Sequence, residues 1–470
     1  MSAPATTEKK YLKWYQKLAY GSGDLASNCS YGLVSSFVLL YLTGTLGLDS
    51  AIIGSLMLAS KVLDGISDVI FGTLIDRTHS KLGKARPWML FGQVGVSLCL
   101  FLLFAIPAGS TTMQYIYFFI VYTALNAVFY TANGIAYSSL VALITKNNNE
   151  RVQLGSFRFM FAVVTNIFMG FAVTGMVEKF GSGAAGWRTT ALIFAIVGLV
   201  VNTISCLAVK ELPEKELSDN TSEAAEEGKA VAEEKKHGFA ETAKILVHNK
   251  YYLMILAIYI VYYIMSNLTT GAGVFCATYY WGDGSLLGQF SMMKMFPVII
   301  ALAIAPVLIK KTGSMQKVNF WGYAISSVLG IPMIYFAMQK NLSMFLLFMF
   351  IKGIFAGTLS GSLNALIAEA SGYTTRTTGI HMDGMMYSCS SLGVKVGGGI
   401  GTAAVGWLLK LGGFVGTATV QSESAIRMIF NLYITFPFVI GIIITVLLAF
   451  LDVEKANKKW DAEHQKEAQA

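Results

Sequence analysis

The sequence predicts an all-α membrane protein with twelve transmembrane helices in two halves of six. Three observations indicate this class: few charged residues, abundant glycine, and a regular series of long apolar runs. Of the 470 residues, 54% are hydrophobic and 13% are charged, whereas soluble domains contain roughly a quarter charged residues. The 46 glycines suit helices that pack closely in lipid, where burial of apolar surface provides little driving force.

Twelve apolar runs are long enough to cross a bilayer, which needs about 20 residues per helix. Because lipid offers the backbone no hydrogen-bond partners, we expect each run to be helical. The runs lie at roughly 17–43, 51–76, 87–107, 113–145, 153–178, 187–209, 251–280, 286–309, 316–338, 342–370, 379–411 and 426–451.

These runs divide the chain into five parts. A cytoplasmic N-terminus (1–16) precedes the first half (17–210), and a linker (211–250) joins it to the second half (251–451) and a cytoplasmic tail (452–470). The linker is rich in Glu, Lys and Ala. This composition is typical of a solvated segment, with room for one amphipathic helix near 239–248. Two sets of six spans around a long central loop resemble major facilitator transporters, in which substrate binds between two rocking halves.

Basic residues are concentrated in alternate loops. Lys81 and Lys84 follow the second run, and Lys310 and Lys311 follow the eighth, whereas the loop around Gly109 lacks Lys and Arg. An excess of Lys and Arg marks the cytoplasmic side, so both termini are expected there. The net charge of +8 follows from this pattern and gives no indication of nucleic-acid binding.

Charged residues within the spans are the main functional signal, because a charge inside the bilayer is costly unless it is paired or hydrated. The segment KVLDGISD in the second span places Lys61, Asp64 and Asp68 on one helix face. Two carboxylates one turn apart repel each other unless a cation such as Na⁺ or a shared proton lies between them. We therefore expect a cation site at Asp64 and Asp68. The alternative is a packing ion pair between Lys61 and one carboxylate.

Three other polar residues within apolar spans are candidates for substrate contacts. Asn28, in the first span, can hydrogen-bond a sugar hydroxyl or form a helix–helix hydrogen bond. Arg158 and Lys395 come from opposite halves, and each can bind sugar hydroxyls or a carboxylate. The alternative for both cations is a salt bridge to an acid of the second or eleventh span, namely Asp64, Asp68 or Asp383.

Other charged and aromatic residues give weaker signals. Asp24 lies near the start of the first span and is interpreted as an end-of-helix charge, and Lys294 as a helix-end charge or an ion-pair partner. Sugar rings stack on aromatic side chains such as Tyr137, although most aromatics of a membrane protein belong to its core or its interfacial belts.

The most specific local motif is GTLIDRTHSKLGKARP, which joins the second and third spans. Such a short basic loop with an acidic anchor can form ion pairs that hold the cytoplasmic side closed. The alternative is plain orientation by positive charge. The motif residues with this expected gating role are Gly72, Asp76, Arg77, Gly83, Lys84 and Arg86.

These segments resemble the glycoside–pentoside–hexuronide:cation symporters. The loop motif, the opening YGSGDLASN, the pair in KVLDGISD and the segment NGIAYSSL fall in that family's order, over roughly residues 17 to 400. The resemblance implies symport of a sugar with H⁺, Na⁺ or Li⁺. It implies that Asp64, Asp68 and Thr131 hold the cation. It also implies that Arg158 contacts the sugar and that Lys395 lies between the two sites.

Two positions depart from the family pattern. Where the family has acidic sugar contacts in the first and fourth spans, this sequence has Asn28 and Gly134, with Asn133 adjacent. Without those carboxylates Arg158 and Lys395 are less compensated. The expected substrate is therefore a neutral pentoside or glycoside, or an anionic hexuronide, with a mild preference for the anion.

The sequence thus predicts a secondary active sugar transporter that couples a glycoside, pentoside or hexuronide to H⁺ or Na⁺ by alternating access. Alternative functions are transport of a lipid or other small molecule on the same scaffold, and sugar sensing without transport. An enzyme is not expected, because no HExxH motif or metal cluster occurs. We expect no cofactor beyond the coupling ion, and no metal beyond Na⁺ at Asp64 and Asp68. The expected form is a monomer in the bacterial inner membrane, whose partners are the sugar, the cation and the lipid.

Overall fold

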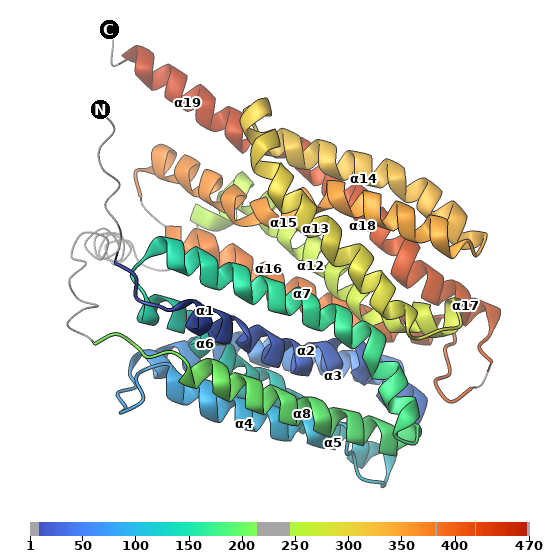
Figure 1. The fold of residues 1–470 in the computed structure, drawn as a ribbon. Coiled ribbons are helices and arrows are strands. Elements are labelled where there is room, and N and C mark those ends of the chain that lie inside the picture. Colours follow the sequence, from blue (N-terminus) through green and yellow to red (C-terminus); the bar gives the residue numbers. More distant parts are fainter. Residues whose placement is uncertain (1–8, 214–244, 381–382, 419, 468–470) are drawn as a thin grey trace. The chain divides into compact units, whose positions relative to one another are not determined.

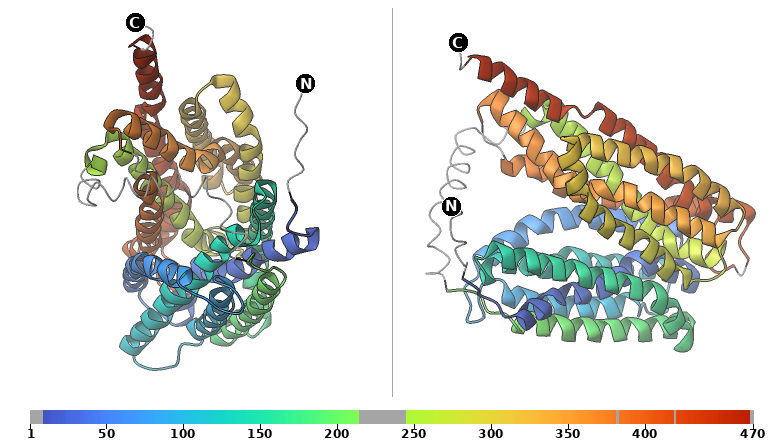
Figure 2. Two further views of the ribbon diagram at one scale, coloured as in Figure 1. Left: turned by 90° about the vertical axis from the view of Figure 1, so that its left-hand side faces the viewer. Right: turned by 45° about the horizontal axis from the view of Figure 1, so that its top comes forward.

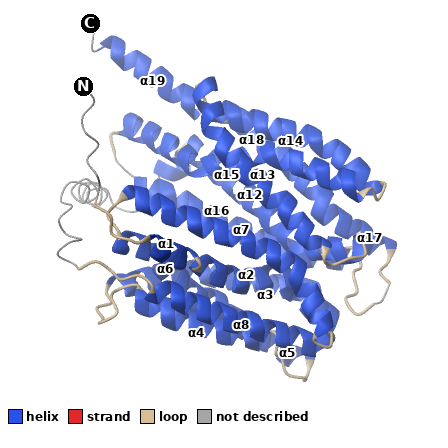
Figure 3. Cartoon of the chain, in the orientation of Figure 1, coloured by secondary structure: helices blue, strands red, loops and turns tan. Residues whose placement is uncertain are grey.

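The computed structural model describes residues 9–213, 245–380, 383–418 and 420–467 (Figure 1). Within these residues every regular element is a helix (Figure 3). This confirms the predicted all-α class. The part of the chain expected to form a linker falls largely on residues 214–244, which lie outside the described residues, as do most residues of the amphipathic helix expected near 239–248.

The chain forms two compact units. The N-terminal unit comprises Met1–Asn220 with Gly282–Gly288 and Leu409–Ser422, and the C-terminal unit comprises Thr221–Trp281, Gln289–Leu408 and Glu423–Ala470. Within each unit long helices run side by side (Figure 2).

Six spans make up the N-terminal unit, and two of them contain a π-helical segment. The first span joins α1, α2 and η1 end to end, and the fourth joins α5, η2 and α6. The elements are α1 (Trp14–Gly21), α2 (Gly23–Leu40), η1 (Tyr41–Thr45), α3 (Ser50–Asp76), α4 (Arg86–Leu103), α5 (Thr111–Thr123), η2 (Ala124–Tyr130), α6 (Thr131–Ile144), α7 (Asn148–Lys179) and α8 (Gly183–Leu207).

The C-terminal unit repeats this series of six spans and adds a terminal helix. Its elements are α12 (Lys250–Phe275), η3 (Cys276–Tyr280), α13 (Leu286–Thr312), α14 (Met315–Met338), α15 (Leu342–Thr378), α16 (Asp383–Leu411), α17 (Glu423–Phe430), η4 (Asn431–Thr435), α18 (Phe436–Phe450) and α19 (Val453–Glu467).

Among the described residues, 11 helices are long and apolar enough to cross a membrane. The one expected span outside these 11 is the second, α3, whose 27 residues are long enough to cross a membrane. It differs from the others because Lys61, Asp64 and Asp68 lie within it. Among the described spans, α3 is thus set apart by three charged residues close together, and these include the candidate cation residues Asp64 and Asp68.

A glutamate beyond the sixth span caps the start of the third span. Glu211 lies four residues after the end of α8 at Leu207 and accepts hydrogen bonds from three backbone N–H groups at the start of α4. Those donors are Lys84, Ala85 and Arg86, at 2.7, 2.9 and 3.0 Å. The carboxylate satisfies donors that have no partner within the helix and complements the helix dipole. The prediction of a solvated linker from residue 211 is wrong at this position.

The C-terminal half repeats this arrangement. Glu454 lies four residues after the end of α18 at Phe450 and accepts hydrogen bonds from the backbone N–H groups of Met315 and Gln316, at 2.8 and 3.0 Å, at the start of α14. The hydroxyl of Ser314 donates a further short hydrogen bond to the same carboxylate. The same offset from the sixth helix and the same target helix indicate that both halves follow one structural plan.

Candidate functional site

Arg158 of α7 and Asp24 of α2 form an ion pair inside the N-terminal unit. The Nε atom of Arg158 donates to Oδ2 of Asp24 at 2.6 Å, and the two side chains retain 25% and 18% of their exposure. The guanidinium also lies over the ring of Tyr137, 4.2 Å from its centroid, a geometry in which a cation is attracted to the aromatic face. Arg158 is thus held by a carboxylate and an aromatic ring, one from each of two neighbouring helices.

Two glycines beside a break in the first span allow this approach. A Cβ atom at Gly21 would lie 2.6 Å from Cβ of Phe157, and one at Gly23 would lie 2.8 Å from the ring of Tyr137. The segment YGSGD therefore brings α7 and α6 against the start of α2, next to Asp24. The interpretation of Asp24 as an end-of-helix charge is wrong, because its carboxylate is the partner of Arg158. Among the ion pairs of the described side chains, Arg158 is paired with Asp24 and not with Asp64 or Asp68.

One turn further along α2, Asn28 is hydrogen-bonded to α7. Its Oδ1 atom accepts from Nδ2 of Asn166 at 2.9 Å, and its own Nδ2 donates to the carbonyl of Asp24 at 2.7 Å. The helix–helix hydrogen bond that was the alternative for Asn28 is therefore present. Asn28 thus joins Asn166 of α7 to the turn of α2 that contains Asp24, the partner of Arg158.

The candidate cation residues Asp64 and Thr131 are in direct contact. The hydroxyl of Thr131 donates to Oδ1 of Asp64 at 2.7 Å, and Nζ of Lys61 lies 3.5 Å from Oδ2. The carbonyl oxygen of Asn126 lies 2.9 Å from the same hydroxyl and is a second acceptor that shares its single hydrogen. That carbonyl lies five residues earlier in the π-helical segment η2, whose wider turn aims the Thr131 hydroxyl at α3. Such π-helical turns are frequent at functional sites.

Three oxygen-bearing groups therefore lie close together on α3 and on the fourth span. Asp68 follows Asp64 by one turn and is partly buried on the same face of α3. The ammonium of Lys61 lies 6.0 Å from the ring centroid of Tyr31, which itself stacks on Tyr130 at 5.6 Å. The position of Lys61 is compatible with both alternatives. Its ammonium forms the ion pair with Asp64, and it also lies beside the candidate cation site at Asp64 and Asp68.

The other predicted substrate residues are Asn133, Lys395 and Tyr137, the last of which lies under the Arg158 guanidinium. Nδ2 of Asn133 donates to Oε1 of Gln93 at 2.6 Å, between α6 and α4, and the Asn133 side chain is buried. This contact fits a packing role. Lys395 lies on α16, in the C-terminal unit, and is partly buried. Tyr137 is fully buried, and its hydroxyl donates to the carbonyl of Tyr20 at 2.8 Å.

The loop motif is anchored by Glu211 of the same half. Gly83 has φ +113°, and a Cβ atom there would lie 2.3 Å from the carboxyl carbon of Glu211. Arg86 donates from Nε to the carbonyl of Cys206 at 3.2 Å. Asp76 ends α3, Arg77 follows it, and no atom lies near the Cβ position of Gly72. The glycine, the three N–H groups and Arg86 thus form one capped turn against the end of α8.

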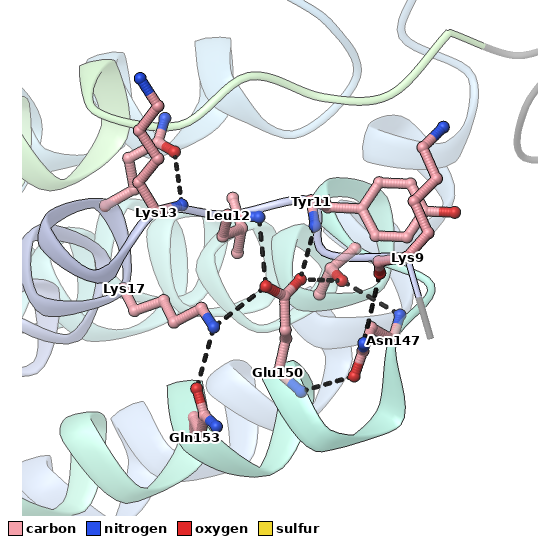
Figure 4. Close-up of polar contacts among 10 residues, drawn as sticks. Lys9, Tyr11, Leu12, Lys13, Lys17, Asn147, Glu150 and Gln153 are labelled. Carbon is pink, nitrogen blue, oxygen red and sulfur yellow. Dashed lines mark hydrogen bonds and ion pairs between the residues drawn. The ribbon is translucent and has the colours of Figure 1, made fainter. Parts of the chain in front are cut away.

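The buried Glu150 fixes the segment before the first span (Figure 4). Glu150 accepts hydrogen bonds from the backbone N–H groups of Tyr11 and Leu12 at 3.1 and 3.2 Å, and its ion pair with Nζ of Lys17 measures 2.9 Å. The hydroxyl of Thr145 donates to the same carboxylate at 2.7 Å. These contacts join residues before α1 to the start of α7, the helix that carries Arg158.

Two residues of interest were missed or underrated from the sequence. Asp24 lies four residues before Asn28, a spacing that puts both on one helix face. Lys352 is a lone cation in the apolar segment FLLFMFIKGIFAG. Arg158 and Lys395 were identified because each is a cation within an apolar span, and the same criterion selects Lys352.

Two bundles of helices long and apolar enough to cross a membrane, with ion pairs inside the N-terminal one, define a polytopic membrane protein. A family model described as "MFS/sugar transport protein" matches residues 19–455. The isoprimeverose transporter of Lactiplantibacillus pentosus is 26% identical over 478 residues, which cover 100% of this chain and 96% of that protein. The putative glycoside/cation symporter YagG of Escherichia coli K12 is 24% identical over 95% of this chain and 93% of its own length.

The fold likeness extends to solved structures. A bacterial homologue of the human lysosomal transporter Spinster aligns with a TM-score of 0.68 at 13% identity, over 95% of this chain and 98% of that chain. The chain belongs to the MFS/sugar transport protein family, and within it to the glycoside–pentoside–hexuronide:cation symporter type of major facilitators. It is a multi-pass sugar transporter and not an enzyme. The predicted family and fold class are therefore confirmed.

Proposed function

We propose that this sugar transporter is a symporter that couples uptake of a glycoside, pentoside or hexuronide to H⁺ or Na⁺ by alternating access. The observation that carries the proposal is the contact of Asp64 with Thr131 at 2.7 Å, with Asp68 one turn away on the same face of α3. A carboxylate pair beside a hydroxyl offers the oxygen ligands that suit a hard cation. The relative named a glycoside/cation symporter supports coupling of this kind.

The coupling follows from charge neutralisation in this proposal. The cation lies between Asp64 and Asp68 with Thr131 as a further ligand, and it removes their repulsion. Cation and sugar then favour the same conformation, and a coupling free energy of about 1–3 kcal/mol is the usual range for such linked binding. The Asp24–Arg158 pair and the neighbouring Asn28 provide donors and an acceptor suited to sugar hydroxyls.

The proposal includes the orientation of the chain in the membrane and its oligomeric state. The basic loops favour cytoplasmic termini, the bacterial relatives favour a bacterial cell membrane, and a monomer contains both six-span halves. The alternatives are a lipid carrier and a sugar sensor. The buried ion pair and the hydrogen-bonded amides favour a polar substrate.

Uptake by reconstituted vesicles tests the proposal. Purified protein is inserted into vesicles, a Na⁺ or proton gradient is imposed, and radiolabelled isoprimeverose, other glycosides and glucuronides are supplied. We expect one of these to accumulate only with a gradient, and Asp64→Asn to abolish accumulation. Asp283→Asn, in an exposed loop, is the matched control and should transport normally. A folded, inserted protein with no cation-dependent flux across the whole panel would overturn the symport proposal.

A further inference from the structure

A cavity of about 180 Å³ lies inside the C-terminal unit. It is surrounded by α12, α13, α14, α15 and the η4–α18 span. Its volume is about six times the share of one water molecule in the liquid, about 30 Å³. The space therefore accommodates a group of several heavy atoms.

Two lysines line this cavity from neighbouring helices, Lys294 of α13 and Lys352 of α15. Lys294 is eight residues after the start of α13 at Leu286, and Lys352 is ten residues after the start of α15 at Leu342. At 1.5 Å per residue these positions are about 12 and 15 Å from the helix starts, well inside a hydrocarbon core of about 30 Å. Two cations at this depth are costly unless something compensates them.

Glycines of α15 hold the two lysines at the same level. A Cβ atom at Gly353 would lie 2.8 Å from Cβ of Pro297 and 3.6 Å from the carbonyl oxygen of Met293. A Cβ atom at Gly357 would lie 2.7 Å from Cβ of Ala301. This small-residue stripe lets α13 and α15 pack closely. The contact of Gly353 with Met293 and Pro297 places Lys352 and Lys294 on adjoining turns, so that both reach the same cavity.

Hydroxyl groups, and no carboxylates, accompany these lysines among the residues that line the cavity. Nζ of Lys294 donates to the hydroxyl oxygens of Thr269 and Thr270 at 3.4 and 3.2 Å. The hydroxyls of Tyr262 and Ser360 are hydrogen-bonded to each other at 2.7 Å on the same wall. Lys352 has no ion pair with any residue the structure describes. The hydroxyls of Thr269 and Thr270 use their hydrogens on the carbonyls of Met265 and Ser266, so the two ammonium groups are the charged donors that match an anion.

We propose that this cavity is a binding site for an oxyanion group, such as a carboxylate or a sulfate, held between Lys294 and Lys352. The anion compensates both buried charges, and the one hydrogen that the Tyr262–Ser360 hydroxyl pair leaves unused can donate to a remaining oxygen. The group is either a free inorganic anion or a substituent of a transported sugar, and both have the same recognition chemistry. The inference goes beyond the proposed symport, because direct anion binding does not require that the chain transport a sugar.

Isothermal titration calorimetry on the full chain in lipid nanodiscs tests the site. The titrants are sodium glucuronate, sodium sulfate and glucose, at constant Na⁺ concentration and pH, so that the coupling ion does not vary. We expect saturable binding of glucuronate and no comparable binding of glucose. Binding of sulfate as well identifies a site that accepts a free anion, whereas binding of glucuronate alone identifies a site for an anionic sugar.

Variants connect the binding to the two lysines. We expect Lys294→Met and Lys352→Met each to weaken anion binding at least tenfold, and Lys310→Met, an exposed position on the same helix α13, to leave it unchanged. Met has similar length without the charge, so both variants are expected to fold. Lys294→Gln and Lys352→Gln provide a second pair if either does not. The proposal is overturned by a folded protein that binds neither anion, by equal binding of glucose and glucuronate, or by lysine variants with unchanged affinity.

Discussion

Arg158 donates its Nε hydrogen bond to Asp24 and not to the acids of α3. This pairing changes the electrostatic description of the N-terminal unit. Arg158, which the sequence suggested was less compensated, has a carboxylate at 2.6 Å, whereas Asp64 is approached by Lys61 and Thr131. The expected surplus of positive charge at Arg158 is therefore absent, and the argument for an anionic substrate moves to Lys294 and Lys352 in the other unit.

The Asp24–Arg158 pair should be strongly coupled in stability. We expect Asp24→Ala or Arg158→Met alone to destabilise the N-terminal unit by about 3 kcal/mol, because each leaves one charge without its partner in a mostly buried position. The double variant Asp24→Ala/Arg158→Met should cost less than the sum of the two. A double-mutant cycle of apparent melting temperatures in one detergent measures this coupling. Strictly additive effects would contradict a direct pair.

The Thr131 hydroxyl should set the apparent affinity for the coupling cation. Thr131→Val removes one oxygen at the site and the hydrogen bond to Asp64, a bond to a charged group that contributes about 1.5–3 kcal/mol. We expect the cation concentration for half-maximal uptake to rise at least about tenfold. Thr131→Ser keeps the hydroxyl and should stay close to wild type. If valine and serine behave alike, Thr131 acts by packing and is not a cation ligand.

The fold was predictable because each span is a local property of the sequence. About 20 apolar residues must form a helix in lipid wherever they pack, so the span positions followed without knowledge of any contact. The pair of Asp64 and Asp68 was predictable for the same reason, since their spacing alone puts them on one helix face. Thr131 was assigned from the family resemblance, and the π-helical turn that aims its hydroxyl at Asp64 has no simple sequence signature.

Contacts between helices could not be predicted in this way. The partner of Arg158 depends on the close approach of α7 to Gly21 and α6 to Gly23, which the glycines permit but do not specify. Glu211 was placed in the linker because its neighbours are polar, yet it lies within reach of the start of α4 only after α8 and α4 have packed. Lys352 carried a detectable signal in its apolar surroundings, although the cavity it lines requires five spans to assemble.

The two capping glutamates should have similar structural roles. We expect Glu211→Ala and Glu454→Ala each to destabilise the protein by about 1–3 kcal/mol, because backbone N–H donors at a helix start lose their acceptor. The glutamine variants retain an acceptor and lose the charge that complements the helix dipole, so they should cost about 0.3–1 kcal/mol. Apparent melting temperatures measure both series. Glu178→Ala, at an exposed position of α7, is the control and should show little change.

The substitution Gly83→Ala distinguishes the packing of Glu211 against the loop turn from the effect of the Glu211 charge. The residue has φ +113°, and a Cβ atom there would overlap the Glu211 carboxylate. We expect it to destabilise the protein about as much as loss of the carboxylate itself. In the background of Glu211→Ala the clash is relieved and only the backbone strain remains, so Gly83→Ala should cost less there. An equal cost in both backgrounds would show that Glu211 does not pack on this turn.

The ion pair of Asp49 with Lys410 should give the protein a pH-dependent contribution to stability. The Oδ2 atom of Asp49 lies 2.6 Å from Nζ of Lys410, and Asp49 also caps α3 by accepting from the N–H groups of Ala51 and Ile52. The hydrogen bond from Lys410 and those backbone donors lower the pKa of Asp49 below its usual range, against a partial opposing effect of burial.

Because the folded pKa of Asp49 is lowered, its contribution is fully present above the unfolded pKa, which is about 3.9 for an aspartate. The contribution is lost as pH falls through the lower folded pKa. We therefore expect Asp49→Asn to lower the apparent melting temperature at pH 7, and the difference from wild type to shrink as pH is taken below about 4. Lys410→Gln should reproduce part of the effect at pH 7, and added salt should weaken it in wild type, since both side chains reach solvent. A difference that stays constant from pH 7 down to the acid limit would show that Asp49 acts as a neutral cap and that its charge contributes nothing.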